Sequence, residues 1–125
     1  MQETNSRSNV LGEATENAAF AWLQRQGLVG IEKNFRCRGG EIDLIMLHRD
    51  ELVFVEVRLR SRTDFGSGAE SVTPRKQQRI ICAAHYFLAM HARWRNYPCR
   101  FDVVAAATTN QQRDWQWLQN AFLAE

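Results

Sequence analysis

Two apolar runs within residues 39–62 each contain a carboxylate at a position where a buried strand would normally carry an apolar side chain. Asp43 interrupts the run at residues 42–47, and Glu56 interrupts the run at residues 52–59. An ionised carboxylate in such surroundings loses hydration, and it stays charged only if a cation or several hydrogen-bond donors compensate it. Any fold of this chain must therefore provide partners for both acids.

The two runs predict a pair of strands joined as a β-hairpin, and the parity of the loop decides how the acids lie. If the loop has an even number of residues, either two or four, Leu47 faces Leu52. Asp43 then lies directly opposite Glu56, with their Cβ atoms roughly 4.5–5.5 Å apart on one face of the sheet. An odd loop would place the acids on different faces. The even register also groups Ile45, Leu47, Leu52 and Phe54 on one face and Val53, Val55, Val57 and Leu59 on the other.

Length and composition predict one globular domain over residues 1–125, with residues 1–10 flexible. Apolar residues make up 45% of the chain, but no apolar run reaches the roughly 18 residues of a membrane helix. The polar N-terminus lacks a signal peptide, so we expect a cytoplasmic protein without membrane contact. The three cysteines, an odd number without a C-x-x-C pair, predict reduced thiols. A homodimer is one of the assemblies that the sequence leaves open.

The remaining pattern predicts helices on both sides of the hairpin. Apolar spacing predicts a helix at residues 12–26, and residues 31–36 form a short edge strand. Thr73-Pro74 is typical of a helix start, and this second helix should run to about Arg93. A strand at residues 101–107 follows, so strand, helix and strand predict a parallel crossover. Residues 61–71 are predicted to be a mobile loop, and residues 114–123 a small strand with a closing helical turn.

Glu16 is a third acid in an unexpected place, because it borders the apolar face of the first predicted helix. A carboxylate at such a position is unexpected and has no partner assigned by the pattern. One explanation is a first-turn acid that is favoured by the helix dipole.

The negative charge of the two hairpin acids could be compensated in two ways. Two or three carboxylates suit Mg²⁺ or Mn²⁺, which keep waters that a substrate phosphate can replace. Alternatively, Arg58 or Arg60 forms structural ion pairs with them. The start of the second helix adds free backbone N–H groups and three cations that would attract an anion, or would simply form a solvated surface. These three cations are Arg75, Lys76 and Arg79.

The net charge of +2 does not by itself indicate a nucleic-acid-binding protein, although ten Lys and Arg against seven Asp and Glu lie between Lys33 and Arg79. The three histidines have no metal-ligand spacing, and no serine-hydrolase or nucleotide-binding motif is present. Trp115 and Trp117 could stack on bases, but packing is the commoner explanation for such aromatic residues.

Four ordered motifs resemble the YraN family of uncharacterised bacterial proteins, and the resemblance covers nearly the whole chain. The motifs are Gly-Gly-Glu-Ile-Asp-Leu-Ile at 39–45, Val-Phe-Val-Glu-Val-Arg-Leu-Arg at 53–60, Val-Thr-Pro-Arg-Lys-Gln at 72–77 and Arg-Phe-Asp-Val-Val at 100–104. That family is similar in fold to the PD-(D/E)XK superfamily of restriction endonucleases and Holliday-junction resolvases. The resemblance therefore implies an α/β fold with a restriction endonuclease-like core, a mixed central sheet flanked by helices in the order α-β-β-β-α-β.

The resemblance also implies that Glu16, Asp43 and Glu56 are the metal-site acids, with the carbonyl of Val57 as a further metal ligand. One position departs from the pattern, because the superfamily and most of the family carry lysine where this chain has Arg58. Arginine stays charged and can hold phosphate with two donors, but it does not readily release a proton to act as a base.

These observations lead to one expected function and two alternatives. The first is a Mg²⁺- or Mn²⁺-dependent endonuclease that hydrolyses DNA phosphodiester bonds, with branched or structured DNA as a candidate substrate. Asp43, Glu56 and Glu16 would form its metal site, and Arg58, Arg60, Arg75, Lys76 and Arg79 would contact nucleic acid. The alternatives are a non-catalytic nucleic-acid-binding protein that retains the nuclease fold, and a protein-interaction scaffold whose acids are paired structurally.

Overall fold

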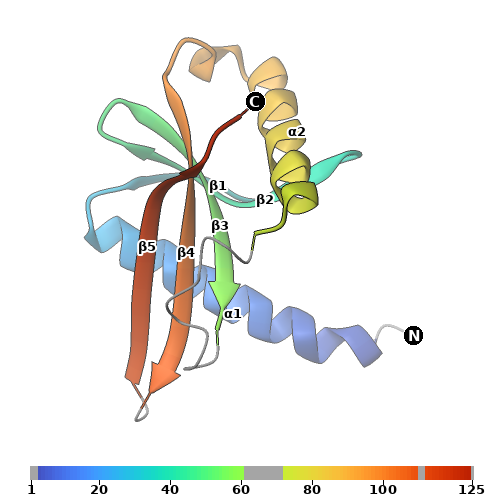
Figure 1. Ribbon diagram of the computed structural model, residues 1–125, viewed down its shortest axis with the longest axis vertical. Helices are drawn as coiled ribbons and strands as arrows, with labels where there is room; N and C mark the ends of the chain where they lie inside the picture. The colour runs from blue at the N-terminus through green and yellow to red at the C-terminus, as the bar shows by residue number, and fades with distance from the viewer. Residues whose placement is uncertain (1–2, 61–71, 110–111, 125) are drawn as a thin grey trace.

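A five-stranded mixed sheet with one long helix on each face forms the core of the protein in a computed structural model (Figure 1). The structure describes residues 3–60, 72–109 and 112–124, with side chains described for residues 12–60, 72–107 and 113–124. The elements are α1 (Glu3–Arg25), β1 (Val29–Cys37), β2 (Gly40–His48), β3 (Glu51–Leu59), α2 (Pro74–Met90), the 3-10 helix η3 (Ala92–Trp94), β4 (Cys99–Thr109) and β5 (Gln112–Phe122). The predicted order α-β-β-β-α-β is confirmed, and one more strand follows it.

The strands lie in the sheet in the order in which they occur in the chain. β1, β2 and β3 form an antiparallel meander, β3 and β4 are parallel, and β5 pairs antiparallel with β4. The predicted parallel crossover is confirmed, because α2 connects β3 to its neighbour β4. The loop predicted at residues 61–71 lies outside the described residues.

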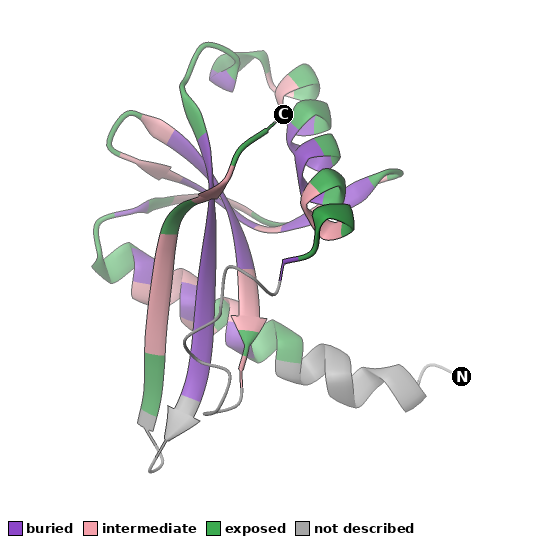
Figure 2. Cartoon of the chain, viewed as in Figure 1, coloured by how far each residue is buried: buried purple, intermediate pink, exposed green. Residues whose placement is uncertain are grey.

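The β2–β3 hairpin has the even register that the sequence favoured. Its loop is Arg49-Asp50, and Leu47 is paired with Leu52. The faces also agree with the prediction, since Phe54 packs in the apolar cluster under α2 and Val55 packs in the cluster under α1. Both faces of the central strands are therefore buried, as the purple ribbon in Figure 2 shows. An acid in these strands has little access to water.

Helix α2 begins as predicted and ends earlier than predicted. The hydroxyl of Thr73 accepts a hydrogen bond from the Lys76 N–H at 3.2 Å, and Pro74 occupies the first turn. The helix ends at Met90 because His91 leaves the helical conformation, with φ −127° and ψ 82°. The short 3-10 helix then carries the chain to about where the sequence had placed the helix end. At the other end of the chain, α1 starts at Glu3 and not at Gly12.

The C-terminal segment corrects one prediction. In place of a small strand and a closing helical turn, it forms the 11-residue strand β5. Trp115 and Trp117 lie on its inner face and pack against Trp22 of α1. Their ring centroids lie 5.6 and 6.0 Å, respectively, from the ring centroid of Trp22. This packing gives the alternating aromatic residues a structural role. Among the described residues, none of the helices is both long and apolar enough to cross a membrane.

Candidate functional site

Asp43 and Glu56 meet where β2 and β3 begin to separate. The ladder between these strands pairs Leu44 with Val55, and the next position in the same register brings Asp43 opposite Glu56. Beyond that point, the Val57 N–H donates a hydrogen bond to a carboxylate oxygen of Asp43, at 2.8 Å, and not to a backbone carbonyl of β2. The two acid side chains are hydrogen-bonded to each other. The predicted opposition of the hairpin acids is therefore present.

Glu16 completes a cluster of three acids, because its side chain on α1 is hydrogen-bonded to Asp43. A hydrogen bond between two carboxyl groups requires that one of them carry a proton. Burial is the main reason that the pKa of Asp43 is raised to about 6; the hydrogen bond from the Val57 N–H lowers this pKa, and the charge of Glu16 raises it further. Burial and then the charge of Asp43 raise the pKa of Glu56 to about 7, and burial also raises the pKa of Glu16. The fold thus brings together acids that it does not fully compensate.

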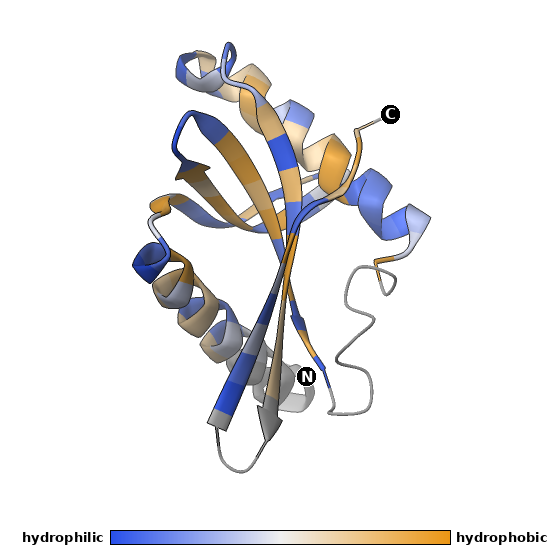
Figure 3. Ribbon diagram, turned by 60° about the vertical axis from the view of Figure 1, so that its left-hand side comes forward, coloured by the Kyte–Doolittle hydropathy of each residue, from blue (hydrophilic) through white to orange (hydrophobic). Residues whose placement is uncertain are grey.

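Two cations reach Glu56, and both approach the same oxygen. The Lys76 Nζ lies 3.2 Å from Glu56 Oε2, and the Arg58 Nη1 lies 3.4 Å from it. Arg58 projects from the same strand as Glu56, whereas Lys76 comes from the first turn of α2. Figure 3 shows hydrophilic residues at both the end of β3 and the start of α2. Of the cations predicted to contact nucleic acid, Arg58 and Lys76 therefore lie directly at the acids.

The other predicted cations surround this centre. Arg75 and Arg79 are exposed on α2. Arg60 follows β3, and its backbone N–H donates to the carbonyl oxygen of Ala106 at 2.8 Å. The start of α2 is thus a cationic surface beside the acids, as the sequence predicted, while Lys76 also turns inward to Glu56.

Two glycines allow α2 to lie close to the acids. A Cβ atom on Gly40 would overlap the main-chain carbonyl of Arg79, and a Cβ atom on Gly39 would come within 2.6 Å of Cys82 Sγ. The backbone of the turn between β1 and β2 therefore packs directly against the second and third turns of α2. This close approach explains why two glycines directly precede the first acidic motif.

Asn34 and Arg36 of β1 belong to the site, although the sequence analysis gave them no role. Asn34 lies between the paired positions that flank Asp43, and its side chain is hydrogen-bonded to Glu16. Its φ of +56° is in the left-handed region, although strand β1 continues through this residue. Arg36 lowers the pKa of Glu16 through its charge. Asparagine tolerates the left-handed conformation, so an Asn within the strand predicted at residues 31–36 was the available signal.

The acids fit a hydrated divalent cation better than an all-protein cage. Among the described residues, no group of three or more His, Cys, Asp and Glu side chains is arranged to hold a metal ion. Asp43 and Glu56 nevertheless present adjacent hard oxygen donors, and Mg²⁺ commonly binds through one or two carboxylates while it retains several waters. A positive charge between them would offset the like charges that, after burial, raise the pKa values of both acids. The resemblance to the YraN family implies the Val57 carbonyl as a further ligand.

A second buried acid, Asp102 in β4, belongs to a separate network. Arg100 donates to it from Nε at 3.0 Å and from Nη2 at 3.1 Å, and the Trp117 indole N–H and Asn120 backbone N–H add bonds of 2.9 Å each. Arg100 also contacts His48 and Glu51 in the β2–β3 hairpin. This network explains the Arg-Phe-Asp motif as structural, a role that the sequence analysis had not assigned.

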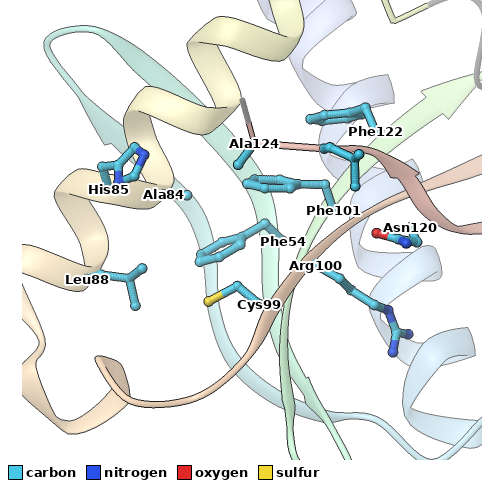
Figure 4. Close-up of a pocket in the computed structure, with 11 residues that line it drawn as sticks. Phe54, Ala84, His85, Leu88, Cys99, Arg100, Phe101, Asn120, Phe122 and Ala124 are labelled. Carbon is cyan, nitrogen blue, oxygen red and sulfur yellow. The ribbon is translucent and has the colours of Figure 1, made fainter.

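The structure also contains an apolar cavity of about 140 Å³ between the second half of α2 and the end of β5 (Figure 4). Phe54, Leu88, Phe101 and Phe122 line it. None of the predicted site residues does, so the cavity is not part of the acid cluster.

Fold and site together define a mixed α/β protein with a partly compensated carboxylate cluster at the end of its central hairpin. Residues 15–106 match the uncharacterised protein family UPF0102, and the chain belongs to this family. Relatives named UPF0102 proteins include one from Pseudomonas putida KT2440, which is 51% identical over 89% of this chain and 90% of its own length. Others come from Stutzerimonas stutzeri A1501, at 49% identity over 94% and 98%, and from Alcanivorax borkumensis SK2, at 48% over 91% and 92%. The family assignment confirms the resemblance to YraN proteins.

Proposed function

We propose that the protein is a Mg²⁺- or Mn²⁺-dependent endonuclease that hydrolyses DNA phosphodiester bonds in the cytoplasm, with branched or otherwise structured DNA as its candidate substrate. The observation that carries this proposal is the pair Asp43 and Glu56, two adjacent buried carboxylates whose pKa values are raised by burial and by the charge of a neighbouring acid. The resemblance to the PD-(D/E)XK superfamily supports the same function.

In this proposal each residue has a defined role. Asp43 and Glu56 hold the divalent ion together with the Val57 carbonyl, and Glu16 orients the site through its hydrogen bond to Asp43. When bound, the ion supplies activation of a water molecule and neutralisation of charge on the phosphate. Arg58 donates to the scissile phosphate, and the exposed Arg75 and Arg79 at the start of α2 hold neighbouring phosphates. Arg60 extends this contact from the end of β3.

The direct test is cleavage of supercoiled, single-stranded and four-way-junction DNA with either metal. We expect the Asp43→Asn and Glu56→Gln variants to lose at least ~100-fold in cleavage rate at unchanged circular dichroism, since loss of even an outer partner of a metal ligand costs 10–100-fold. Arg95→Gln is a control for the loss of a charged side chain. Arg95 directly follows η3 and is far in the sequence from Asp43 and Glu56. Equal cleavage by wild-type and Asp43→Asn protein would contradict the proposal.

A non-catalytic nucleic-acid-binding protein is the second candidate, and Arg58 is the observation that favours it. Arginine replaces a lysine there, and it already contacts Glu56 at 3.4 Å. This candidate predicts salt-dependent DNA binding that weakens in Arg58→Ala, Arg60→Ala and Lys76→Ala without any metal requirement. The Arg58→Lys variant separates the two, because a large gain in cleavage would reveal a retained catalytic site. DNA binding that requires metal and is lost in Asp43→Asn would contradict the second candidate.

A further inference from the structure

Lys76 and Arg58 both contact the Oε2 atom of Glu56, yet they differ in how they are held. The guanidinium of Arg58 lies two residues along the same strand, and 24% of its side chain is exposed. Lys76 reaches across from α2, and 39% of its side chain is exposed. A lysine has a flexible four-carbon stem and three rotatable donors, whereas an arginine fork is planar and rigid. Lys76 is therefore the cation that can leave Glu56 without a change in the sheet.

The contact between Lys76 and Glu56 is incompatible with a metal ion on the same oxygen. Glu56 Oε2 is within 3.2 Å of the ammonium, so an ion bound there would lie within a few ångströms of a second positive charge. Such charges repel each other strongly in a site with little water. We expect a metal ion on this oxygen to displace the ammonium, because Lys76 is the more mobile of the two cations at Oε2. The displaced group then lies beside the exposed first turn of α2. An anionic phosphate is the partner expected at that position.

We propose that Lys76 is an exchangeable counter-ion: it neutralises Glu56 in the metal-free protein, and it transfers to a phosphate oxygen of the substrate when a divalent ion takes its place. This inference rests on the proposed function and adds an order of events to it. Metal binding releases the cation that then holds the phosphate, so Lys76 contributes to the affinity for substrate only after the metal is present. Lys76 and the metal compete for Glu56, and Lys76 is a positioning residue.

The competition gives Lys76 a signature that a simple phosphate-binding lysine lacks. Removal of a phosphate-binding cation weakens substrate binding and leaves the affinity for metal alone unchanged. Removal of an exchangeable counter-ion strengthens the binding of metal alone, because Glu56 is no longer occupied. The side chain can be altered safely, since the part of Lys76 that caps α2 is its backbone N–H.

The experiment is titration calorimetry of the full chain with MnCl₂, without DNA, at a pH of about 8, where Asp43 and Glu56 are mostly ionised. We expect Lys76→Gln to bind Mn²⁺ roughly tenfold more tightly than the wild type. Lys76→Arg retains the charge and should bind within about twofold of the wild type. Arg75→Gln removes the same charge one residue away, from an exposed side chain, and should also leave the Mn²⁺ affinity within about twofold.

The outcomes separate this inference from the proposed function. Binding of Mn²⁺ to the wild type with an equal or weaker affinity in Lys76→Gln overturns the counter-ion role and leaves the metal site intact. An equal gain in Arg75→Gln also overturns it, because the effect would then be one of general charge. No binding of Mn²⁺ by either protein overturns the proposed metal site, and this inference with it.

Discussion

Two buried acids on adjacent strands are held in opposite ways. Asp102 of β4 is fully buried and accepts hydrogen bonds from Arg100, Trp117 and Asn120. Glu56 of β3, only 4% exposed, has a second acid beside it and two cations at 3.2 and 3.4 Å. In the β3–β4 ladder the two acids are one position apart. Burial alone therefore does not distinguish the two acids, whereas the completeness of their compensation does.

The largest expected effect comes from breaking the complete network. Arg100→Met leaves the Asp102 carboxylate buried without its cation, and loss of one partner of a buried pair typically costs about 3–5 kcal/mol of unfolding free energy. Urea unfolding at neutral pH measures this cost. Arg79→Met, at an exposed position, is the control and should change stability by less than about 0.5 kcal/mol. A small loss in Arg100→Met would show that Asp102 does not depend on its cation.

Glu56→Gln should have the opposite effect, and the effect should depend on pH. Because the pKa of Glu56 is raised from 4.5 to about 7, folding favours the protonated carboxyl. Its stabilising contribution is present below pH 4.5 and is lost as the pH rises through about 7. Glutamine mimics the protonated form, so the variant should be more stable than the wild type by on the order of 2 kcal/mol at a pH of about 8.5.

Urea unfolding of Glu56→Gln and wild type across this pH range tests the expectation. The stabilities should converge near pH 4.5, where the wild-type carboxyl is protonated. If the variant were less stable at every pH, Glu56 would be compensated as completely as Asp102, and the contrast between the two acids would disappear.

Divalent metal should stabilise only the incompletely compensated acids. At a concentration ten times its dissociation constant, Mg²⁺ or Mn²⁺ should add about 1.4 kcal/mol to the unfolding free energy of the wild type. Asp43→Asn removes one ligand and should lose most of this gain. Thermal unfolding with the metal and with EDTA provides the measurement. An equal gain in Asp43→Asn would place the metal elsewhere on the protein.

The smallest expected effect concerns the edge of the Asp102 network. His48 Nδ1 lies 2.8 Å from the Arg100 Nη2, and Arg100 retains its bonds to Asp102 when the histidine is removed. His48→Ala should therefore cost only about 0.5–1.5 kcal/mol, the usual contribution of one hydrogen bond. The comparison is made by urea unfolding at neutral pH. A loss of unfolding free energy as large as that of Arg100→Met would mean that the Asp102 network depends on His48 as much as on Arg100.

Short-range features of this protein could be predicted from the sequence, since they follow from local geometry. The alternation of side chains and an even loop were enough to oppose Asp43 and Glu56. Thr73-Pro74 was enough to locate the start of α2. The form of residues 114–123 was less well predicted, because tertiary packing of Trp115 and Trp117 on α1 favours a strand. The end of α2 was also less well predicted, since Pro98 was the stop signal and the chain leaves the helix earlier, at His91.

Contacts between distant elements could not be predicted from patterns. Lys76 was recognised as a cation at a helix start, but its contact with Glu56 depends on how closely α2 approaches the sheet. Arg100 and Asp102 were noticed only as part of a motif, because their partners Glu51 and Asn120 are far away in the sequence. The metal, the substrate and the catalytic activity stay predictions.

The glycine turn before β2 limits how far the site can adapt. Side-chain contacts between helix and sheet can rearrange through changes of rotamer, but Gly39 and Gly40 have no rotamers, and Gly40 lies directly against the backbone of α2. The distance between the helix and the sheet is consequently fixed by main-chain atoms at this point. Substitutions in the core can change the side-chain volumes around the site. The distance that the Lys76 side chain must cross from α2 to Glu56 stays the same.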